Sequence, residues 1–347
     1  MTDLRGLMRV GLTYNLKHGE PEEGQDPPST NREAQAEWDD QSTIDAVITA
    51  LRERHEVVPI DAAEDPFNAL RQSQPDIVFN IAEGANGPCR EGHIPSILEY
   101  LNIPYTASDP LTLSLCLDKS RAKEILGYHN LPTPRFQVSA GDGFKPNGLR
   151  FPLMVKPLFE GSSIGIRDDS LVANPDDLAR RISWVTERFR QPALIEEFLA
   201  GREFTVAILG NGEDARVLPI VEIRFDSLPA GVNPIYSYEA KWIWDQSSNP
   251  LQIFECPARI DAGLRAEIER ICLGAYRTMR CRDWCRIDVR LDGGNRPHIL
   301  ELNPLPGILP RPEDNSCLPK AARAAGMSYN ELINKVLDIA CRRYGMH

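Results

Sequence analysis

Two segments near the C-terminus and the turn between them decide the fold: Arg286-Ile287-Asp288-Val289-Arg290-Leu291, then Asp292-Gly293-Gly294-Asn295, then His298-Ile299-Leu300-Glu301-Leu302-Asn303-Pro304. Polar and apolar residues alternate in both segments, as in strands whose successive side chains point to opposite faces. The Asp-Gly-Gly-Asn run is typical of the turn of a β-hairpin. Arg286 and Asp288 therefore share a face of the first strand. Glu301 and Asn303 share a face of the second.

This hairpin predicts a metal site. Two carboxylates, an amide oxygen and a guanidinium converge on one small surface, while the apolar residues between them anchor the strands to a core. Oxygen ligands suit a hard cation such as Mg²⁺, which keeps some waters and bridges substrate phosphates. The alternative is an exposed hairpin whose polar face meets water. An exposed face rarely sorts its acids against an arginine at matched alternation, so we favour the metal site.

The composition narrows the class of protein. The chain has 347 residues, enough for two or three small domains, and 42% of them are hydrophobic. A formal net charge of −11 argues against nucleic acid as the main partner. No apolar run is long enough to span a membrane, and the N-terminus lacks the apolar core of a secretory signal, which predicts a cytoplasmic protein. The 8 cysteines are scattered and are expected to be reduced thiols.

The first part of the chain alternates strands and helices, an order that favours a parallel sheet covered by helices. The polar stretch 17–31 is expected to be a surface loop. A second unit begins near Asp118, and the hairpin belongs to a third, so we expect units at 1–117, 118–209 and 210–347. The expected strands lie at 8–14, 56–60, 76–81, 104–105, 136–139, 153–157, 193–196 and 204–209, and the expected helices at 42–54, 67–71, 94–101, 119–126, 175–189 and 329–342.

A glycine- and serine-rich loop follows the strand at 153–157. Its sequence, Leu158-Phe159-Glu160-Gly161-Ser162-Ser163-Ile164-Gly165, can present successive backbone N–H groups to phosphate oxygens. Lys119 and Lys156 precede it and could neutralise the same anion. The loop matches neither familiar nucleotide signature, and alone it would be an ordinary turn. Lys119 alone would be a solvated helix residue. With the metal hairpin, the loop indicates phosphate binding.

The segment 194–204 forms a strand, a short crossing and the start of another strand. Exposed backbone in such a crossing can pair with the edge of an adenine, and Glu203 could reach ribose hydroxyls. The alternative is a charged loop that only connects two strands.

Together these segments resemble the D-alanine–D-alanine ligase family of the ATP-grasp superfamily, from residue 75 to the C-terminus. No matching segment is decisive alone, but the whole set in this order is highly specific for the family. The matching segments are Ile103-Pro104-Tyr105-Thr106-Ala107-Ser108, Leu117-Asp118-Lys119, Val155-Lys156-Pro157, the loop 160–165, Glu196-Glu197-Phe198-Leu199, Gly201-Arg202-Glu203-Phe204-Thr205-Val206, Tyr236-Ser237-Tyr238-Glu239-Ala240-Lys241, Arg286-Ile287-Asp288, the stretch 301–307 and the stretch 321–328.

The resemblance implies a three-domain ATP-grasp fold of the α/β (α+β) class. An N-terminal parallel α/β domain would precede two α+β domains, whose antiparallel sheets hold ATP between them. The implied ATP-binding residues are Lys119, Lys156, Glu160, Ser162 and Ser163 near the phosphates, Glu196 with the backbone of Glu197 and Leu199 at the adenine, and Glu203 at the ribose; Asp288, Glu301 and Asn303 would bind two Mg²⁺ ions, which Mn²⁺ could replace.

The implied activity is that of an ADP-forming carboxylate–amine ligase acting on small molecules, expected as a homodimer. ATP would phosphorylate a carboxylate, and an amine would attack the acyl phosphate. Arg286 and the backbone N–H of Gly307 would stabilise the oxyanion, and Lys241 would belong to a lid that excludes water. Ser162 would position the substrate and the lid, and Ser316 would bind the carboxylate of the second substrate.

Departures from the family pattern cluster around the first substrate, the donor whose carboxylate is activated. The family's first strand runs into a Gly-Gly-x-Ser loop with a glutamate for the donor ammonium, but neither Asn15 nor Glu20 sits at that place. Ala82-Glu83-Gly84 replaces a His-Gly pair, and Trp242 replaces the lid tyrosine. We therefore hypothesise a donor other than D-alanine, either another amino acid or a specialised metabolite, as in mycosporine-type pathways.

Three other functions compete with this one. A true D-alanine–D-alanine ligase of cell-wall synthesis keeps the chemistry but changes the donor. A non-catalytic ATP-binding regulator should have lost a metal acid or the oxyanion arginine, and none is missing. A kinase-like phosphotransferase would not need the pair Arg286 and Gly307. A dinucleotide oxidoreductase is disfavoured because the first strand-to-helix turn lacks the glycine fingerprint.

Overall fold

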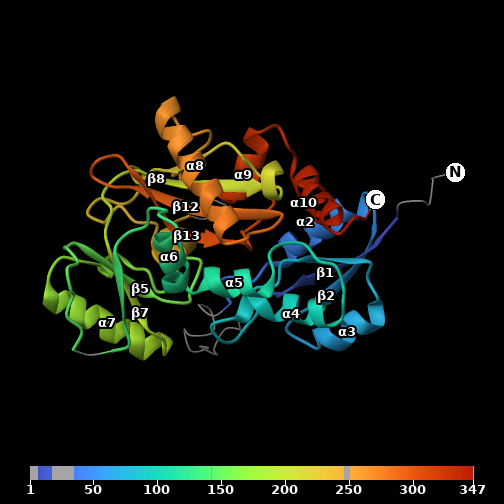
Figure 1. The fold of residues 1–347 in the computed structure, drawn as a ribbon, viewed down its shortest axis with the longest axis horizontal. Helices are drawn as coiled ribbons and strands as arrows, with labels where there is room; N and C mark the ends of the chain where they lie inside the picture. The colour runs from blue at the N-terminus through green and yellow to red at the C-terminus, as the bar shows by residue number, and fades with distance from the viewer. Residues whose placement is uncertain (1–6, 18–34, 142, 246–250, 347) are drawn as a thin grey trace.

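The computed structural model describes residues 7–17, 35–141, 143–245 and 251–346. Apart from Lys17, the expected loop at 17–31 lies outside these residues. The chain folds into three sheets, with the three-stranded and the four-stranded sheets at opposite ends in Figure 1. Within the described segments, no helix is both long and apolar enough to cross a bilayer.

The N-terminal sheet is parallel, as the alternation of strands and helices predicts, with the order β2-β1-β3. Its middle strand is buried on both faces because helices cover it on either side. The expected strand at 104–105 is reduced to a single bridge between Val78 and Tyr105. The elements are β1 (Arg9–Tyr14), β2 (Glu56–Asp61), β3 (Ile77–Asn80), α2 (Gln41–Arg52), α3 (Pro66–Ser73), α4 (His93–Tyr100) and α5 (Pro110–Leu117), with a 3₁₀ turn at Arg90–Gly92.

The second sheet is antiparallel, in the order β4-β7-β5-β6, and α7 packs against it. Helix α7 begins where the sequence predicts, because the side chain of Asn174 caps it and Pro175 and two acids fill its first turn. The elements are α6 (Lys119–Tyr128), β4 (Phe136–Ser139), β5 (Leu153–Pro157), β6 (Leu171–Val172), α7 (Pro175–Phe189) and β7 (Ala193–Glu197), with a 3₁₀ turn at Asp168–Ser170.

The largest sheet contains the predicted hairpin. Its order is β11-β10-β8-β12-β13, with β9 paired to β8. Strand β8 pairs with both β10 and β12, so residues 203–209 belong to this sheet, although the expected boundary at 209 groups them with the central unit. The elements are β8 (Glu203–Leu209), β9 (Arg216–Val217), β10 (Val221–Ile223), β11 (Phe254–Glu255), α8 (Ala262–Thr278), β12 (Trp284–Leu291), β13 (Pro297–Asn303), α9 (Cys317–Ala324) and α10 (Tyr329–Arg343), with a 3₁₀ turn at Gly212–Asp214 and a π turn at Ala240–Trp244.

The C-terminal helix ties the largest sheet to the N-terminal unit. Helices α10 and α2 lie side by side in Figure 1, and both contribute to one hydrophobic cluster. Beneath them, the fully buried carboxylate of Asp283 accepts hydrogen bonds from the backbone N–H of Ala107 at 2.9 Å and from Arg343 at 2.7 Å. This joint fixes the start of β12, and with it the hairpin, relative to the first sheet.

Trp284 is the largest fully buried side chain of this joint, and its ring meets the edge of Phe79 with 5.6 Å between centroids. Replacing Trp284 by alanine should lower the free energy of unfolding by about 3–5 kcal/mol, because the cavity cannot close between two sheets. Chemical denaturation measures the loss. Replacement by phenylalanine is the control and should cost much less, since the indole N–H has no partner within the described residues. An alanine variant as stable as the wild type would contradict this account.

Candidate active site

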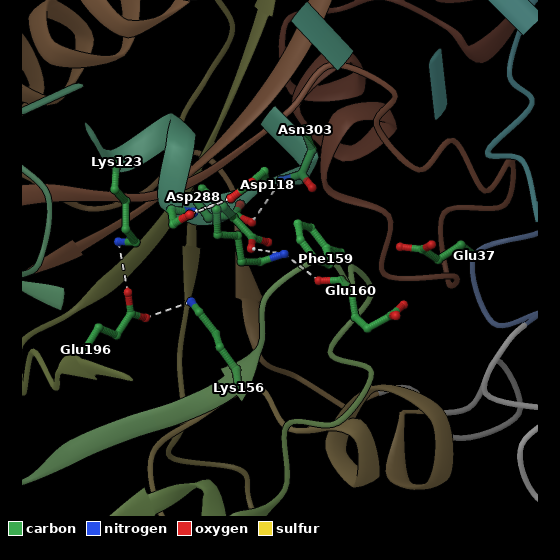
Figure 2. Close-up of polar contacts among 12 residues, drawn as sticks. Glu37, Asp118, Lys123, Lys156, Phe159, Glu160, Glu196, Asp288 and Asn303 are labelled. Atoms are coloured by element: carbon green, nitrogen blue, oxygen red, sulfur yellow. Dashed lines mark hydrogen bonds and ion pairs between the residues drawn. The ribbon is translucent and has the colours of Figure 1, made fainter. Parts of the chain in front are cut away.

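The hairpin brings its polar residues together in register. Arg286 pairs with Asn303 and Asp288 with Glu301 across β12 and β13. A register shift between Asp288 and Val289 sets this pairing, because the register next to the turn would place Leu300 opposite Asp288. Arg286 donates to Asp288 at 3.0 Å and lies 3.9 Å from Glu301, and the Asn303 amide lies 3.4 Å from the same Asp288 oxygen. Figure 2 shows Asp288 and Asn303 on this surface. The site therefore holds two carboxylates within contact of a single guanidinium.

The two carboxylates differ in their ionisation. Burial opposes the charge of Glu301, but Lys119, Lys156 and Arg286 outweigh it and lower the pKa of Glu301 to about 2. Burial raises the pKa of Asp288, with the charge of Glu301 adding to the effect and Arg286 opposing it. Two acids that repel each other in a partly buried position favour a bound cation. The oxygen donors of Asp288, Glu301 and Asn303 thus fit a hard metal ion.

Lysines on a strand and a helix face this surface. The carboxylate of Glu196, 4% exposed, lies 2.7 Å from Lys156 and 2.8 Å from Lys123, and Figure 2 shows it between the two lysines. Burial opposes the charge of Glu196, but the two lysines outweigh it and lower its pKa to about 2. Glu196 therefore holds Lys156 by an ion pair, and the expected contact of its side chain with an adenine stays a prediction. The sequence did not predict a role for Lys123, although Lys123 lies one helical turn from Lys119 on α6.

The predicted phosphate loop adopts an unusual backbone. Ser162 and Ser163 both have left-handed φ angles of 49° and 60°. Ser163 donates to the carbonyl of Tyr236 at 2.8 Å, and the carbonyl of Ser162 accepts from the Trp242 indole at 3.0 Å. These contacts join the loop to the segment 236–242. Lys119 donates to the backbone carbonyl of Glu160.

Glu160 itself does not face the site with its side chain. Its carboxylate accepts from Gln191 at 2.6 Å and from Arg90 at 3.4 Å. Its backbone carbonyl meets Lys119 of the site, and the expected contact of Glu160 with ATP stays a prediction. The carboxylate of Glu197 likewise pairs with Arg150, at 3.3 Å.

Two cavities adjoin at the hairpin. They share Ser162, Lys241, Arg286 and Glu301. Ser316 lines neither, because its hydroxyl donates to the carbonyl of Gly307 at 3.0 Å and accepts from Leu309. Among the predicted residues, the first cavity is also lined by Lys156, Ser163, Glu196, Glu197, Leu199, Glu203 and Asp288, and the second by Lys119, Asn303 and Gly307.

Lys241 covers the junction from the segment 236–242. Burial lowers its pKa to about 8, and the charge of Arg286 adds to this effect. The Lys241 ammonium lies 5.2 Å from the ring centre of Trp242. The ammonium of Lys17, from the N-terminal unit, lies 4.9 Å from the same ring centre. This segment therefore contacts both the phosphate loop and the N-terminal unit, as a lid would.

The N-terminal unit contributes three acids to the second cavity that sequence reasoning missed as site residues: Glu37, Glu83 and Glu91. Glu37 lies shortly before α2 and pairs with Arg90 at 2.6 Å. Asn15, in contrast, is buried and accepts from the N–H of Gly84 at 2.8 Å, so it supports the cavity wall. Glu20 lies outside the described residues. The sequence signal that could have located Glu37 was an acid shortly before α2, rather than one at the end of β1.

Several known proteins are similar to this chain in sequence and in fold. A family model described as "D-ala D-ala ligase C-terminus" matches residues 144–338. An uncharacterized protein of Sinorhizobium fredii, y4sG, is 35% identical over 88% of this chain and 90% of its own length. A D-alanine–D-alanine ligase of Bordetella avium is 37% identical over 81% and 84% of the two chains. The crystal structure of a D-alanine–D-alanine ligase from Bacillus anthracis superposes with a TM-score of 0.72 at 26% identity, over 97% and 99% of the two chains. The chain therefore belongs to the D-alanine–D-alanine ligase family of the ATP-grasp superfamily, whose members are ATP-dependent ligases that form carbon–nitrogen bonds.

Proposed function

We propose that this chain is an ADP-forming ligase that joins an amino acid to the carboxylate of an amino-acid-like or metabolite donor through an acyl phosphate. The observation that carries the proposal is the junction of the two cavities at Arg286, Glu301 and Lys241. One cavity has the lysines and acids that a magnesium nucleotide needs. The other holds oppositely charged groups that suit a zwitterionic substrate.

ATP would occupy the first cavity, between the four-stranded and the six-stranded sheets. Lys119 and Lys156 would contact its phosphates with the backbone of the loop at Ser162 and Ser163. Backbone groups of Glu197 and Leu199 would meet the adenine. Glu203, which is buried and pairs with Arg290 at 2.6 Å, would be held in place for the ribose hydroxyls.

Asp288, Glu301 and Asn303 would hold two Mg²⁺ ions, or Mn²⁺ in their place. Within the described residues, no grouping of three or more His, Cys, Asp or Glu side chains could hold a metal by itself. Two carboxylates and an amide fit ions whose remaining ligands are water and phosphate oxygens. When bound, such ions spread the charge of the transferred phosphoryl group.

The chemistry has two steps. A carboxylate oxygen of the donor attacks the γ-phosphorus of ATP, the bond to the bridging oxygen breaks, and ADP leaves with that electron pair. An amine nitrogen then attacks the acyl carbon and loses a proton, and inorganic phosphate leaves with the former carboxylate oxygen. The guanidinium of Arg286 and the N–H of Gly307 would stabilise the oxyanion between these events. Ser162, Lys241 and Trp242 would shield the acyl phosphate from water, and Ser316 would support the acceptor side through Gly307.

The proposal predicts that purified protein releases ADP only when a carboxylate donor and an amine acceptor are both present with Mg²⁺. A coupled assay over pairs of amino acids and candidate metabolites measures this, with each partner omitted in turn as control. Robust ADP release without any amine, with a stable phosphorylated product, would favour a phosphotransferase instead. ATP binding without turnover of any pair would favour a regulator.

The same assay decides between donors. D-Alanine alone should give little product if the donor site has diverged, as the replacement of His-Gly by Glu83-Gly84 suggests. Efficient formation of D-alanyl-D-alanine would instead assign the chain to cell-wall synthesis and remove the argument for another donor.

A further inference from the structure

The second cavity contains two carboxylates that no described residue neutralises by contact. Glu91 is 8% exposed and lines this cavity, yet within the described residues it makes no hydrogen bond or ion pair. Glu83 lines the same cavity and is equally unpaired in this part of the chain. Glu37 differs from both, because Arg90 already engages it at 2.6 Å.

The backbone holds these two acids in place. The N–H of Gly84 donates to the side chain of Asn15 at 2.8 Å, and its carbonyl accepts from the Trp38 indole at 3.1 Å. Gly84 has a left-handed φ of 74°, and a side chain there would clash with the Arg90 carbonyl. The turn that carries Glu83 is thus packed against the turn that carries Glu91. Because these contacts fix the two turns, Glu83 and Glu91 are held in place to bind a ligand in the cavity.

Cationic side chains line the same cavity. Lys119, Lys241 and Arg286 line it together with Glu301 and Gly307, where the reacting carboxylate would lie. A zwitterion would therefore bind with its carboxylate at the hairpin and its ammonium toward the acids. Burial raises the pKa of Glu83, with the charge of Glu91 adding to the effect, and burial likewise raises the pKa of Glu91 to about 8. A donor with one ammonium therefore pairs with one of the two acids and leaves the other protonated and without a partner among the described residues. A donor with two amino groups satisfies both.

We propose that the donor is a diamino carboxylic acid, whose two ammonium groups are bound by Glu83 and Glu91. This inference rests on the proposed ligase function and names its substrate class. The donor reacts as above: its carboxylate oxygen takes the γ-phosphoryl group, ADP leaves, and the acceptor amine displaces phosphate. Both amino groups of the donor remain free in the product.

Hydroxylamine isolates the donor site, because it intercepts an acyl phosphate as a hydroxamate without an acceptor amino acid. The enzyme is incubated with ATP, Mg²⁺, hydroxylamine and one donor at a time. The panel contains diaminopropionate, diaminobutyrate, ornithine and lysine as both enantiomers. D-Alanine, aminobutyrate, norvaline and norleucine are the controls that lack the second amine. At least one diamino acid should exceed every monoamino acid about tenfold in kcat/KM, the value of one charged hydrogen bond.

The outcomes separate the two proposals. A monoamino acid that reacts as well as or better than every diamino acid would overturn the diamino donor and leave the ligase function standing. If no donor on either list gives hydroxamate or ADP, the diamino donor is overturned, and the wider screen of amino acids and metabolites decides the ligase function. A diamino donor that leads the panel supports both.

Variants test whether the two acids are responsible. Glu83→Gln and Glu91→Gln keep the size of the side chain and should each raise KM for the diamino donor about tenfold. The KM for ATP should not change, and a monoamino donor should be affected less. Glu64→Gln, at an exposed position of the same unit, is the matched control. An equal rise in KM for both kinds of donor would show a structural role and overturn the proposal.

Discussion

Replacing Glu301 by glutamine should lower kcat on the order of 10³-fold, because a metal site that stabilises the transferred phosphoryl group contributes several kcal/mol. Glutamine keeps the size of the side chain but removes the charge that Lys119, Lys156 and Arg286 now surround. The expected signature is a higher Mg²⁺ requirement together with the fall in kcat. ADP release at saturating ATP, titrated with Mg²⁺, measures both.

Glu213→Gln is the matched control for this variant. Glu213 is an acid of the same unit, and its side chain is 93% exposed. The control should keep the wild-type kcat and Mg²⁺ dependence, and both variants should fold, which circular dichroism checks. A Glu301→Gln enzyme with wild-type kcat and an unaltered Mg²⁺ requirement would remove Glu301 from the metal site.

Replacing Arg286 by methionine should lower kcat about 10²–10³-fold, as the loss of one oxyanion donor does. Arg286→Lys should recover only part of this loss, because lysine keeps the charge but not the planar fork of donors. The KM for ATP should change little, since we propose that Lys119 and Lys156 make the main contacts with the nucleotide. Steady-state kinetics with ATP and the best donor pair provide both constants.

Arg296→Met controls for the loss of an arginine from the same hairpin. Arg296 lies at the turn, with a side chain that is 76% exposed, and pairs with Asp292 at 2.7 Å. Its replacement should leave kcat unchanged. An Arg286→Met enzyme that keeps its kcat would mean that another group stabilises the oxyanion.

Local patterns predicted the hairpin and most elements because their causes are local. The alternation over 286–291 and 298–303 and the turn between them indicate the two strands, but they do not reveal the register shift between Asp288 and Val289 that pairs Asp288 with Glu301. Helix α7 was predicted at its true limits because its cap and first turn carry clear signals. Helix α5 was missed, because Leu111, Leu113 and Leu115 alternate with polar residues at the period of a strand.

The remaining site residues depend on tertiary packing, which one sequence does not display. Lys123 meets Glu196 only because α6 lies against the four-stranded sheet. Glu37, Glu83 and Glu91 converge from three segments of the first unit. Strand β8 follows the second sheet in sequence but pairs within the third, so a boundary drawn from sequence order alone separates it from its partners. The limits of the three units remain a prediction.

Oxygen transfer tests the acyl phosphate most directly. The best donor is prepared with both carboxylate oxygens as ¹⁸O and converted to product with unlabelled ATP and acceptor. Because the donor oxygen attacks the γ-phosphorus and later leaves with it, each inorganic phosphate should carry one ¹⁸O atom, which mass spectrometry detects. Phosphate without label, formed in step with the amide product, would contradict the mechanism at its centre.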